Sequence, residues 1–137
     1  MPADPPRRPG AALALILTLA AAPVAAKPPL SEVDKITEGL IATGIAYEIS
    51  EVCADLSPRR LRGFGFLMSL RRHALDLGYS RAEVDAYIDN DAEADRLESI
   101  ARTRLAEKGA VEGDPASYCR VGRREMAADS RIGRLLR

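Results

Sequence analysis

Few residues in this sequence have side chains that could do chemistry, and they lie far apart. The chain of 137 residues has one histidine, His73, and two cysteines, Cys53 and Cys119. His73 stands beside Arg71 and Arg72, in a basic stretch of the chain. No serine, cysteine or aspartate stands at a recognised catalytic spacing from this histidine, so a catalytic triad has no support. We expect His73 to be a surface residue.

Acidic residues are more plentiful, and one group of them alternates along the chain. Asp89, Asp91, Glu93 and Asp95 occupy every second position, which resembles the spacing of a calcium-binding loop. The glycine that such a loop needs is missing, and the intervening alanines favour a helix. We therefore expect a solvated helix junction, and the sequence predicts no metal site, no cofactor and no enzymatic activity.

The first 26 residues have the organisation of a removable secretory signal. A pair of arginines precedes an apolar run from Ala11 to Ala22, and small residues follow as far as Ala26. This order is typical of a signal peptide, with cleavage after about Ala26. The run is shorter than the roughly 20 residues of a membrane-spanning helix. We expect a signal peptide at 1–26 and an exported helical domain at 27–137, which for a bacterial chain means a periplasmic protein.

The exported domain would carry almost no net charge. Removing Asp4, Arg7 and Arg8 from 20 basic and 20 acidic residues leaves 18 basic and 19 acidic ones. One domain is expected at this size, with roughly two-thirds of the unfolded surface buried on folding. This composition excludes a multidomain enzyme and a disordered acidic tail. Because the domain is neutral and has two Phe and four Tyr for base stacking, nucleic acid is a poor candidate for a partner.

If the domain is exported, its two cysteines are expected to form a disulfide. Cys53 and Cys119 are an even pair, 66 positions apart, in a small chain expected in an oxidising compartment. A disulfide closing a loop of that length stabilises a protein by about 4 kcal/mol at 25 °C. Two separately buried thiols are the alternative. The spacing does not fit a Cys-x-x-Cys redox pair, and a single histidine does not complete a zinc site.

Apolar residues recur at steps of three and four along the predicted domain, which indicates helices. A capping-box-like start at Ser31 predicts a first helix that reaches roughly Cys53. Gly39 and Gly44 weaken this helix, so we expect another helix to come close to them.

Two more helix starts follow. Ser57-Pro58 combines an N-cap residue with proline at the first helical position, and Gly78 predicts the end of that second helix. Its inward side should consist of Leu61, Phe64, Leu67, Met68 and Leu75. Ser80 repeats the cap signature and opens a third segment with Val84, Tyr87 and Ile88 facing inward.

The rest of the chain continues the helical pattern. A fourth helix should run through Leu97, Ile100, Ala101 and Leu105 to Gly109, and it could be continuous with the third as one bent helix. Asp114-Pro115 predicts the start of the last helix, whose Cys119, Gly122 and Met126 share one face. The fold class is therefore an all-α, single-domain bundle of four to five short helices. One disulfide would join the first and last helices.

Charge is segregated along the chain although the total cancels. The segment 57–76 has five Arg and one acid, 80–100 has two Arg and seven acids, and 113–137 has six Arg and three acids. One interpretation is that the acidic helices lie near the basic ones and neutralise them within the molecule. The other is an Arg-rich face that docks on an acidic partner or on anionic lipid. For the second, the candidate contacts are Arg123, Arg124, Arg131, Arg134 and Arg137, with Leu135 and Leu136 as apolar anchors.

Four segments carry a resemblance to a known family. They are 26–30, 77–80, 117–122 with its Tyr-Cys pair, and 130–137 with its Ile-Gly-x-Leu-Leu-Arg ending. Together they resemble DUF5333, a domain-of-unknown-function family of small exported bacterial proteins. The resemblance implies a helical, periplasmic protein with one disulfide, and it implies no activity. It also implies an accessory role on the periplasmic side of a membrane respiratory complex such as the NADH:quinone oxidoreductase.

The sequence thus favours a non-enzymatic, exported domain that binds another protein, as an accessory factor with peripheral contact to a membrane complex. A small periplasmic stress chaperone is an alternative, because such proteins resemble this chain in size, helical content and single disulfide. A further alternative is an immunity protein that neutralises a secreted toxin.

Overall fold

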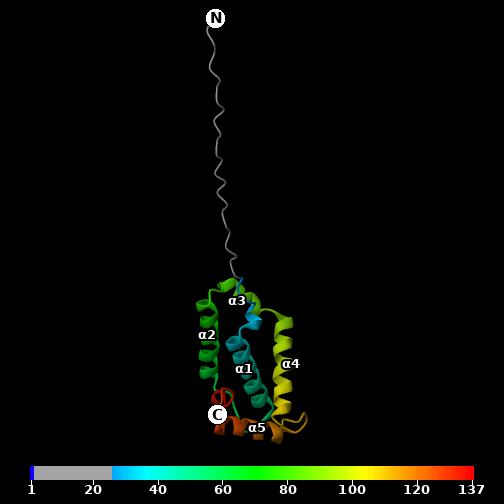
Figure 1. The fold of residues 1–137 in the computed structure, drawn as a ribbon. Helices are drawn as coiled ribbons and strands as arrows, with labels where there is room; N and C mark the ends of the chain where they lie inside the picture. Colours follow the sequence, from blue (N-terminus) through cyan, green and yellow to red (C-terminus); the bar gives the residue numbers. More distant parts are fainter. Residues whose placement is uncertain (2–25) are drawn as a thin grey trace.

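The domain consists of five α-helices and two short 3-10 turns (Figure 1). The structure, a computed structural model, describes Met1 and residues 26–137, so the predicted signal peptide lies almost wholly outside the described residues. The described residues form no β-strand, which confirms the all-α prediction. In chain order the elements are η1 (Leu30–Glu32), α1 (Asp34–Val52), α2 (Arg60–Asp76), α3 (Arg81–Ile88), α4 (Asp91–Glu107), α5 (Pro115–Ala127) and η2 (Gly133–Leu135).

Helix α1 is the centre of the domain. In Figure 1 it lies between α2 and α4, while α5 crosses one end of these helices and α3 covers the other end. Because α1 packs against α2, α4 and α5, it buries residues on several sides rather than along one stripe. Its buried residues are Ile36, Gly39, Ile41, Ala42, Ile45, Ala46 and Ile49.

The two glycines of α1 differ in how closely they are packed. A Cβ atom at Gly39 would lie 2.7 Å from Cδ1 of Leu70 on α2, well inside van der Waals contact. The predicted close approach of another helix is therefore confirmed at Gly39. At Gly44 a Cβ atom would lie 3.6 Å from Cβ of Ala101 on α4, which is ordinary contact.

Helix α1 begins two residues later than the sequence predicts. Ser31 lies in η1, and α1 starts at Asp34 without a side-chain hydrogen bond from its N-cap residue Val33. The carbonyl group of Ser31 instead accepts a hydrogen bond of 3.0 Å from Oγ1 of Thr37. The predicted capping box at Ser31 is wrong because the chain makes one tight turn that buries Leu30 before the helix begins.

The predicted start of the second helix is also wrong. Helix α2 begins at Arg60, and the backbone N–H and C=O of Ser57 form two hydrogen bonds of 2.9 Å with the backbone of Arg137. Pro58 forms an isolated antiparallel bridge with Leu136. The segment before α2 is thus paired with the C-terminal tail, so Ser57 and Pro58 are not available as N-cap and first helical residue.

The other predicted helix ends are confirmed. Ser80 and Glu83 form a complete capping box at α3, and Asn90 caps α4, so these are two helices rather than one bent helix. Gly78, with φ of +89°, takes the left-handed conformation expected just after a helix. At α5, the side chain of Asp114 accepts a hydrogen bond from a backbone N–H of the first turn, and a proline follows it.

The segment after α5 is docked on the domain. Ile132, Leu135 and Leu136 are between 0% and 7% exposed and belong to the main core cluster. A Cβ atom at Gly133 would lie 2.1 Å from the backbone oxygen of Glu125, so only glycine fits where the tail crosses the end of α5. The tail is therefore part of the core.

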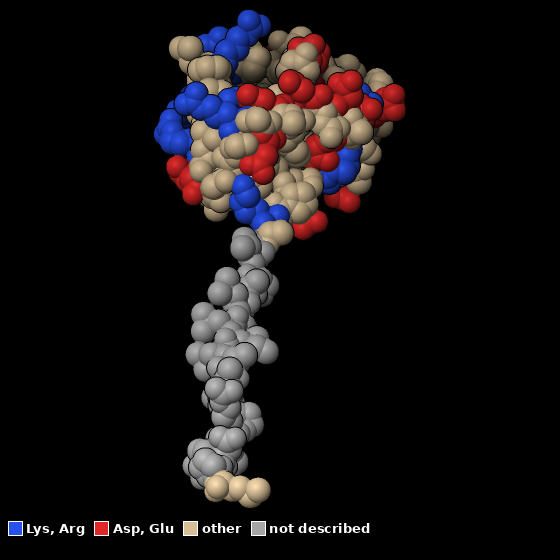
Figure 2. Space-filling view, turned by 90° about the horizontal axis from the view of Figure 1, so that it is seen from above, with Lys and Arg blue, Asp and Glu red and all other residues tan. Residues whose placement is uncertain are grey.

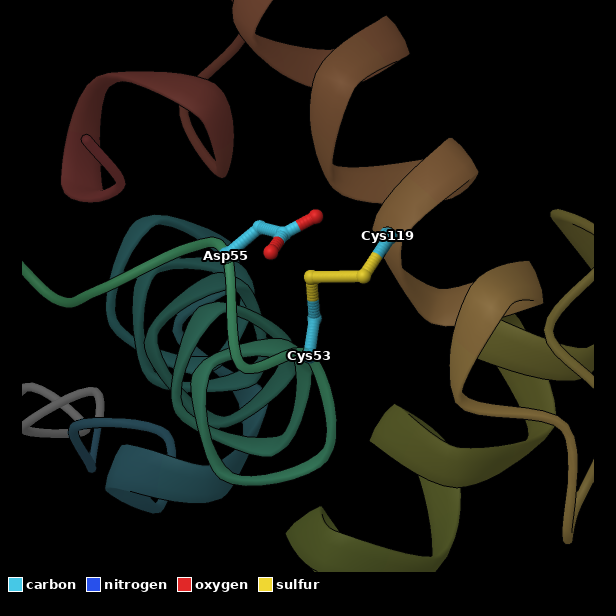
Figure 3. Close-up of side chains that lie close together, drawn as sticks. All are labelled: Cys53, Asp55 and Cys119. Carbon is cyan, nitrogen blue, oxygen red and sulfur yellow. A yellow bond between two sulfur atoms is a disulfide. The ribbon is translucent and has the colours of Figure 1, made fainter.

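A disulfide closes the fold where α1 ends (Figure 3). Cys53 follows the last residue of α1 and is bonded to Cys119 of α5, with 5.2 Å between their Cα atoms. Both cysteines are buried. The predicted disulfide between the first and last helices is confirmed.

The apolar side of α2 is oriented differently from the prediction. Leu61, Phe64 and Met68 were expected to face inward, but their side chains are 91%, 64% and 37% exposed. Leu70 and Ala74 are the residues of α2 that are buried. Leu61, Phe64 and Met68 do lie at steps of three and four along α2, as the sequence indicates. Among the described residues, however, no helix packs over them.

Candidate protein-binding groove

An apolar groove of about 350 Å³ lies where α1, α2 and α3 meet. Twelve residues line it, and Arg71 is the one charged residue among them. Arg71 is held at the edge by an ion pair of 2.9 Å with Asp85 of α3. The lining consists of Leu30, Ile36, Leu40, Phe64, Leu67, Met68, Leu70, Arg71, Ala74, Val84, Tyr87 and Ile88.

Large side chains remain exposed to solvent along this groove. Phe64 and Met68 come from α2, and Ile88, which is 59% exposed, comes from the end of α3. The prediction that Ile88 faces inward is wrong, because the short α3 turns only Val84 into the core. Large apolar residues that are exposed side by side are a common feature of interaction sites. The sequence did single these residues out as apolar, but it could not show that their side is left uncovered.

A polar network stands at one edge of the groove. The hydroxyl of Tyr87 donates a hydrogen bond of 2.8 Å to Glu93, whose carboxylate also binds the guanidinium of Arg96. Burial and the bond to Glu93 raise the pKa of Tyr87 to about 12, so this tyrosine stays neutral near pH 7. The hydrogen bonds from Arg96 lower the pKa of Glu93. The hydrogen bond to Glu93 anchors the hydroxyl end of Tyr87, whose ring lines the groove.

Three of the five arginines predicted to contact a partner are engaged by the chain itself. Arg123 forms an ion pair of 2.6 Å with Asp55, and Arg134 contacts the carboxylate and the carbonyl group of Asp129. Arg124 donates a hydrogen bond to the carbonyl oxygen of Lys108. Because these pairs are largely exposed, each contributes little stability, but they hold the guanidinium groups close to the domain.

The other two arginines lie in different surroundings. Arg131 borders a polar cavity of about 460 Å³ between α1, α4 and the tail, together with the ion pair of Glu38 and Arg104. The hydrogen bond from Arg104 lowers the pKa of Glu38, against a smaller opposing effect of burial. Arg137 borders the start of α2. The five predicted arginines therefore do not share one set of contacts.

The two predicted apolar anchors are not on the surface. Leu135 is 6% exposed and Leu136 is 0% exposed, and both pack in the core beneath the start of α2. This corrects the expectation that they contact a partner. Apolar residues at the end of a chain look available in the sequence, but here the tail returns to the core.

Asp55 lies beside the disulfide and completes a group of three potential metal ligands (Figure 3). The two sulfur atoms are bonded to each other, and the Asp55 carboxylate is paired with Arg123. In the part of the chain that the structure describes, these atoms are committed to a covalent bond and an ion pair, both of which join the end of α1 to α5.

A model described as a family of unknown function, DUF5333, matches residues 28–137. The chain belongs to the DUF5333 family. The match covers all five helices, so the groove and the disulfide both lie within the DUF5333 domain. No curated protein and no solved structure matches the chain.

The charge segregation seen in the sequence of this DUF5333 domain is visible on its surface. In the view from above (Figure 2), basic side chains concentrate on the side where α2 lies and acidic ones on the side of α4. Ion pairs such as Arg71–Asp85 neutralise part of this charge within the molecule. Within the described residues, no helix is both long and apolar enough to cross a membrane.

Proposed function

We propose that the protein is a non-enzymatic, periplasmic binding protein that holds an apolar segment of another protein in the groove between α1, α2 and α3. The observation that carries this proposal is the groove itself, with Phe64, Met68 and Ile88 exposed around an apolar lining. Covering apolar surface is favourable by about 25 cal/mol per Å². A partner that buries these three side chains therefore gains binding energy from a surface that the domain leaves open.

The shape of the groove favours a helical partner segment. Two of its walls are the helices α2 and α3, and both contribute apolar side chains to the lining. A helix binds such a groove through apolar residues at steps of three and four, with its polar face outward. We propose an accessory role on the periplasmic side of a membrane complex, and a respiratory complex such as the NADH:quinone oxidoreductase is the first partner to test.

Affinity capture with surface variants tests the proposal. Replacing Phe64 and Ile88 together by Asn should abolish recovery of a partner from a periplasmic extract. The matched control makes the same replacement at Tyr47 and Val111, which lie outside the groove and are exposed to a similar extent. This control should leave recovery of the partner unchanged. Equal recovery by both variants, with the same unfolding temperature as the original protein, would show that the groove is not the binding site.

A second candidate function, an acid-activated chaperone, is favoured by the carboxylates that join helices. Hydrogen bonds from Arg104 lower the pKa of Glu38, which links α1 to α4. Burial opposes ionisation of Glu125, but bonds from Lys108 and Ser130 outweigh it and lower its pKa. Acid would therefore weaken these contacts between helices, and we propose that apolar surface becomes exposed as a result. Failure to suppress aggregation of an unfolded client at low pH, with the protein in excess, would exclude this function.

A further inference from the structure

We propose that the start of α2 attaches the protein to the surface of an anionic phospholipid bilayer. This site lies beyond the groove of the proposed function. In Figure 1 the first turn of α2 is at the end of the domain near the C-terminus, whereas α3, which forms one wall of the groove, covers the opposite end. A shallow surface depression of about 610 Å³ marks the place, lined by Pro58, Arg59, Arg60, Leu61, Arg62 and Arg137.

The positive charge at this site is not neutralised by the protein. No ion pair in the described part of the chain involves Arg59, Arg60 or Arg62, and the first turn of α2 contains no acidic residue. Nε of Arg59 donates a hydrogen bond of 2.8 Å to the carbonyl group of Leu136, which holds this arginine in place. Arg59, the N-cap residue of α2, and Arg60 and Arg62 of its first turn are thus exposed together as a compact cationic surface.

Leu61 distinguishes a bilayer from an acidic protein surface as the binding partner. Its side chain is 91% exposed in the middle of the three arginines, the highest value for a large apolar residue in residues 26–137. Basic residues around a protruding apolar side chain are the pattern of a helix that lies at a membrane interface, with cations at the phosphate groups and the apolar residue among the acyl chains. A purely acidic protein surface would leave Leu61 in water.

Co-sedimentation with lipid vesicles tests this attachment. Purified oxidised protein should bind vesicles of phosphatidylcholine with phosphatidylglycerol, should bind vesicles of phosphatidylcholine alone weakly, and should be released by high salt. Each arginine near an anionic surface contributes about a fivefold factor, so replacing Arg60 and Arg62 by Gln should weaken partitioning roughly 30-fold. Adding Leu61→Asn to this variant should weaken partitioning further. The matched control, Arg81→Gln with Arg120→Gln, removes as much charge elsewhere and should change partitioning only slightly.

The outcomes separate this proposal from the proposed function. Absence of binding to phosphatidylglycerol vesicles would overturn the lipid site and leave an acidic protein surface as the partner of these arginines. Equal weakening by the control pair would also overturn it, since the effect would then be one of total charge. Ile88→Asn, a groove variant, should keep full vesicle binding, whereas the Arg60 and Arg62 variant should keep the captured protein partner. Circular dichroism would confirm that all variants are folded.

Discussion

At the residue scale, the most informative comparison is between two leucines whose sequence roles are reversed in the structure. Leu61 was expected in the core and is 91% exposed, whereas Leu136 was expected at a partner surface and is 0% exposed. Both assignments followed from apolar spacing and chain position alone. What decides burial is the surface that lies opposite each residue, and for Leu136 that surface is the segment before α2, more than 70 positions away in the chain.

The same substitution should therefore destabilise the domain strongly at Leu136 and hardly at all at Leu61. Leu136→Ala removes fully buried atoms and should lower the free energy of unfolding by about 3 kcal/mol, as large-to-small changes in a core do. Leu61→Ala should change it by less than about 0.5 kcal/mol. Urea denaturation followed by circular dichroism measures both. Similar values for the two variants would contradict the burial described here.

Local signals at single residues were the most predictable part of the fold. Ser80, Asp114 and Gly78 act within one turn of their own helix, so neighbouring residues suffice to recognise them. Ser31 failed as a cap because burial of Leu30 extends the turn before α1. The candidate site was less predictable, because the groove depends on how α2 is rotated about its axis against α1.

At the element scale, a disulfide and a few ion pairs join the helices, in addition to the buried core. The disulfide and the Arg123–Asp55 pair join the end of α1 to α5. Glu38–Arg104 joins α1 to α4, and Lys108–Glu125 joins the end of α4 to α5. The sequence predicted the covalent joint from an even pair of cysteines. It did not predict the ionic joints, because many arginines and acids are equivalent partners until the helices are placed.

Removal of the disulfide should destabilise the domain strongly. Replacing Cys53 and Cys119 together by Ser should lower the free energy of unfolding by about 4 kcal/mol, because the cross-link spans 66 positions and restricts the unfolded chain. The unmodified protein treated with a reductant should lose a similar amount, which controls for the substitutions. Urea midpoints that coincide for oxidised and reduced protein would contradict a stabilising role.

Stability should fall in acid because the joining carboxylates are more acidic in the folded state. The pKa of Glu38, Glu93 and Glu125 lies below the ordinary value of 4.5. Their contribution is fully present well above pH 4.5, and it is lost as the pH falls through the lowered folded-state values. Thermal unfolding temperatures should therefore drop between about pH 5 and pH 3.

A single substitution tests this origin of the acid sensitivity. Glu38→Gln removes one titrating joint, so the drop in unfolding temperature between about pH 5 and pH 3 should become smaller. Glu112→Gln, which removes a carboxylate outside the ion pairs found among the described residues, should leave the profile unchanged. If both variants followed the original profile, the Glu38–Arg104 joint would not contribute to acid sensitivity.

At the scale of the whole molecule, the central helix α1 divides the domain into a closed end and an open side. The disulfide, α5 and the docked tail close the end where α1 finishes, and the main core cluster lies there. Towards the start of α1, the short α3 covers the end of the helices but leaves the apolar groove uncovered along α2. The groove and the main core cluster thus lie in different regions, so variants of the exposed groove residues should fold normally.

Site-specific photocrosslinking in intact cells tests the central claim, that the groove binds another protein, most directly. A photoreactive phenylalanine analogue would replace Phe64 in the groove and, as a control of similar size and exposure, Tyr47 on α1. We predict a discrete crosslinked species from position 64 that is absent from position 47. No crosslinked species from position 64, or the same species from both positions, would contradict the groove as the binding surface.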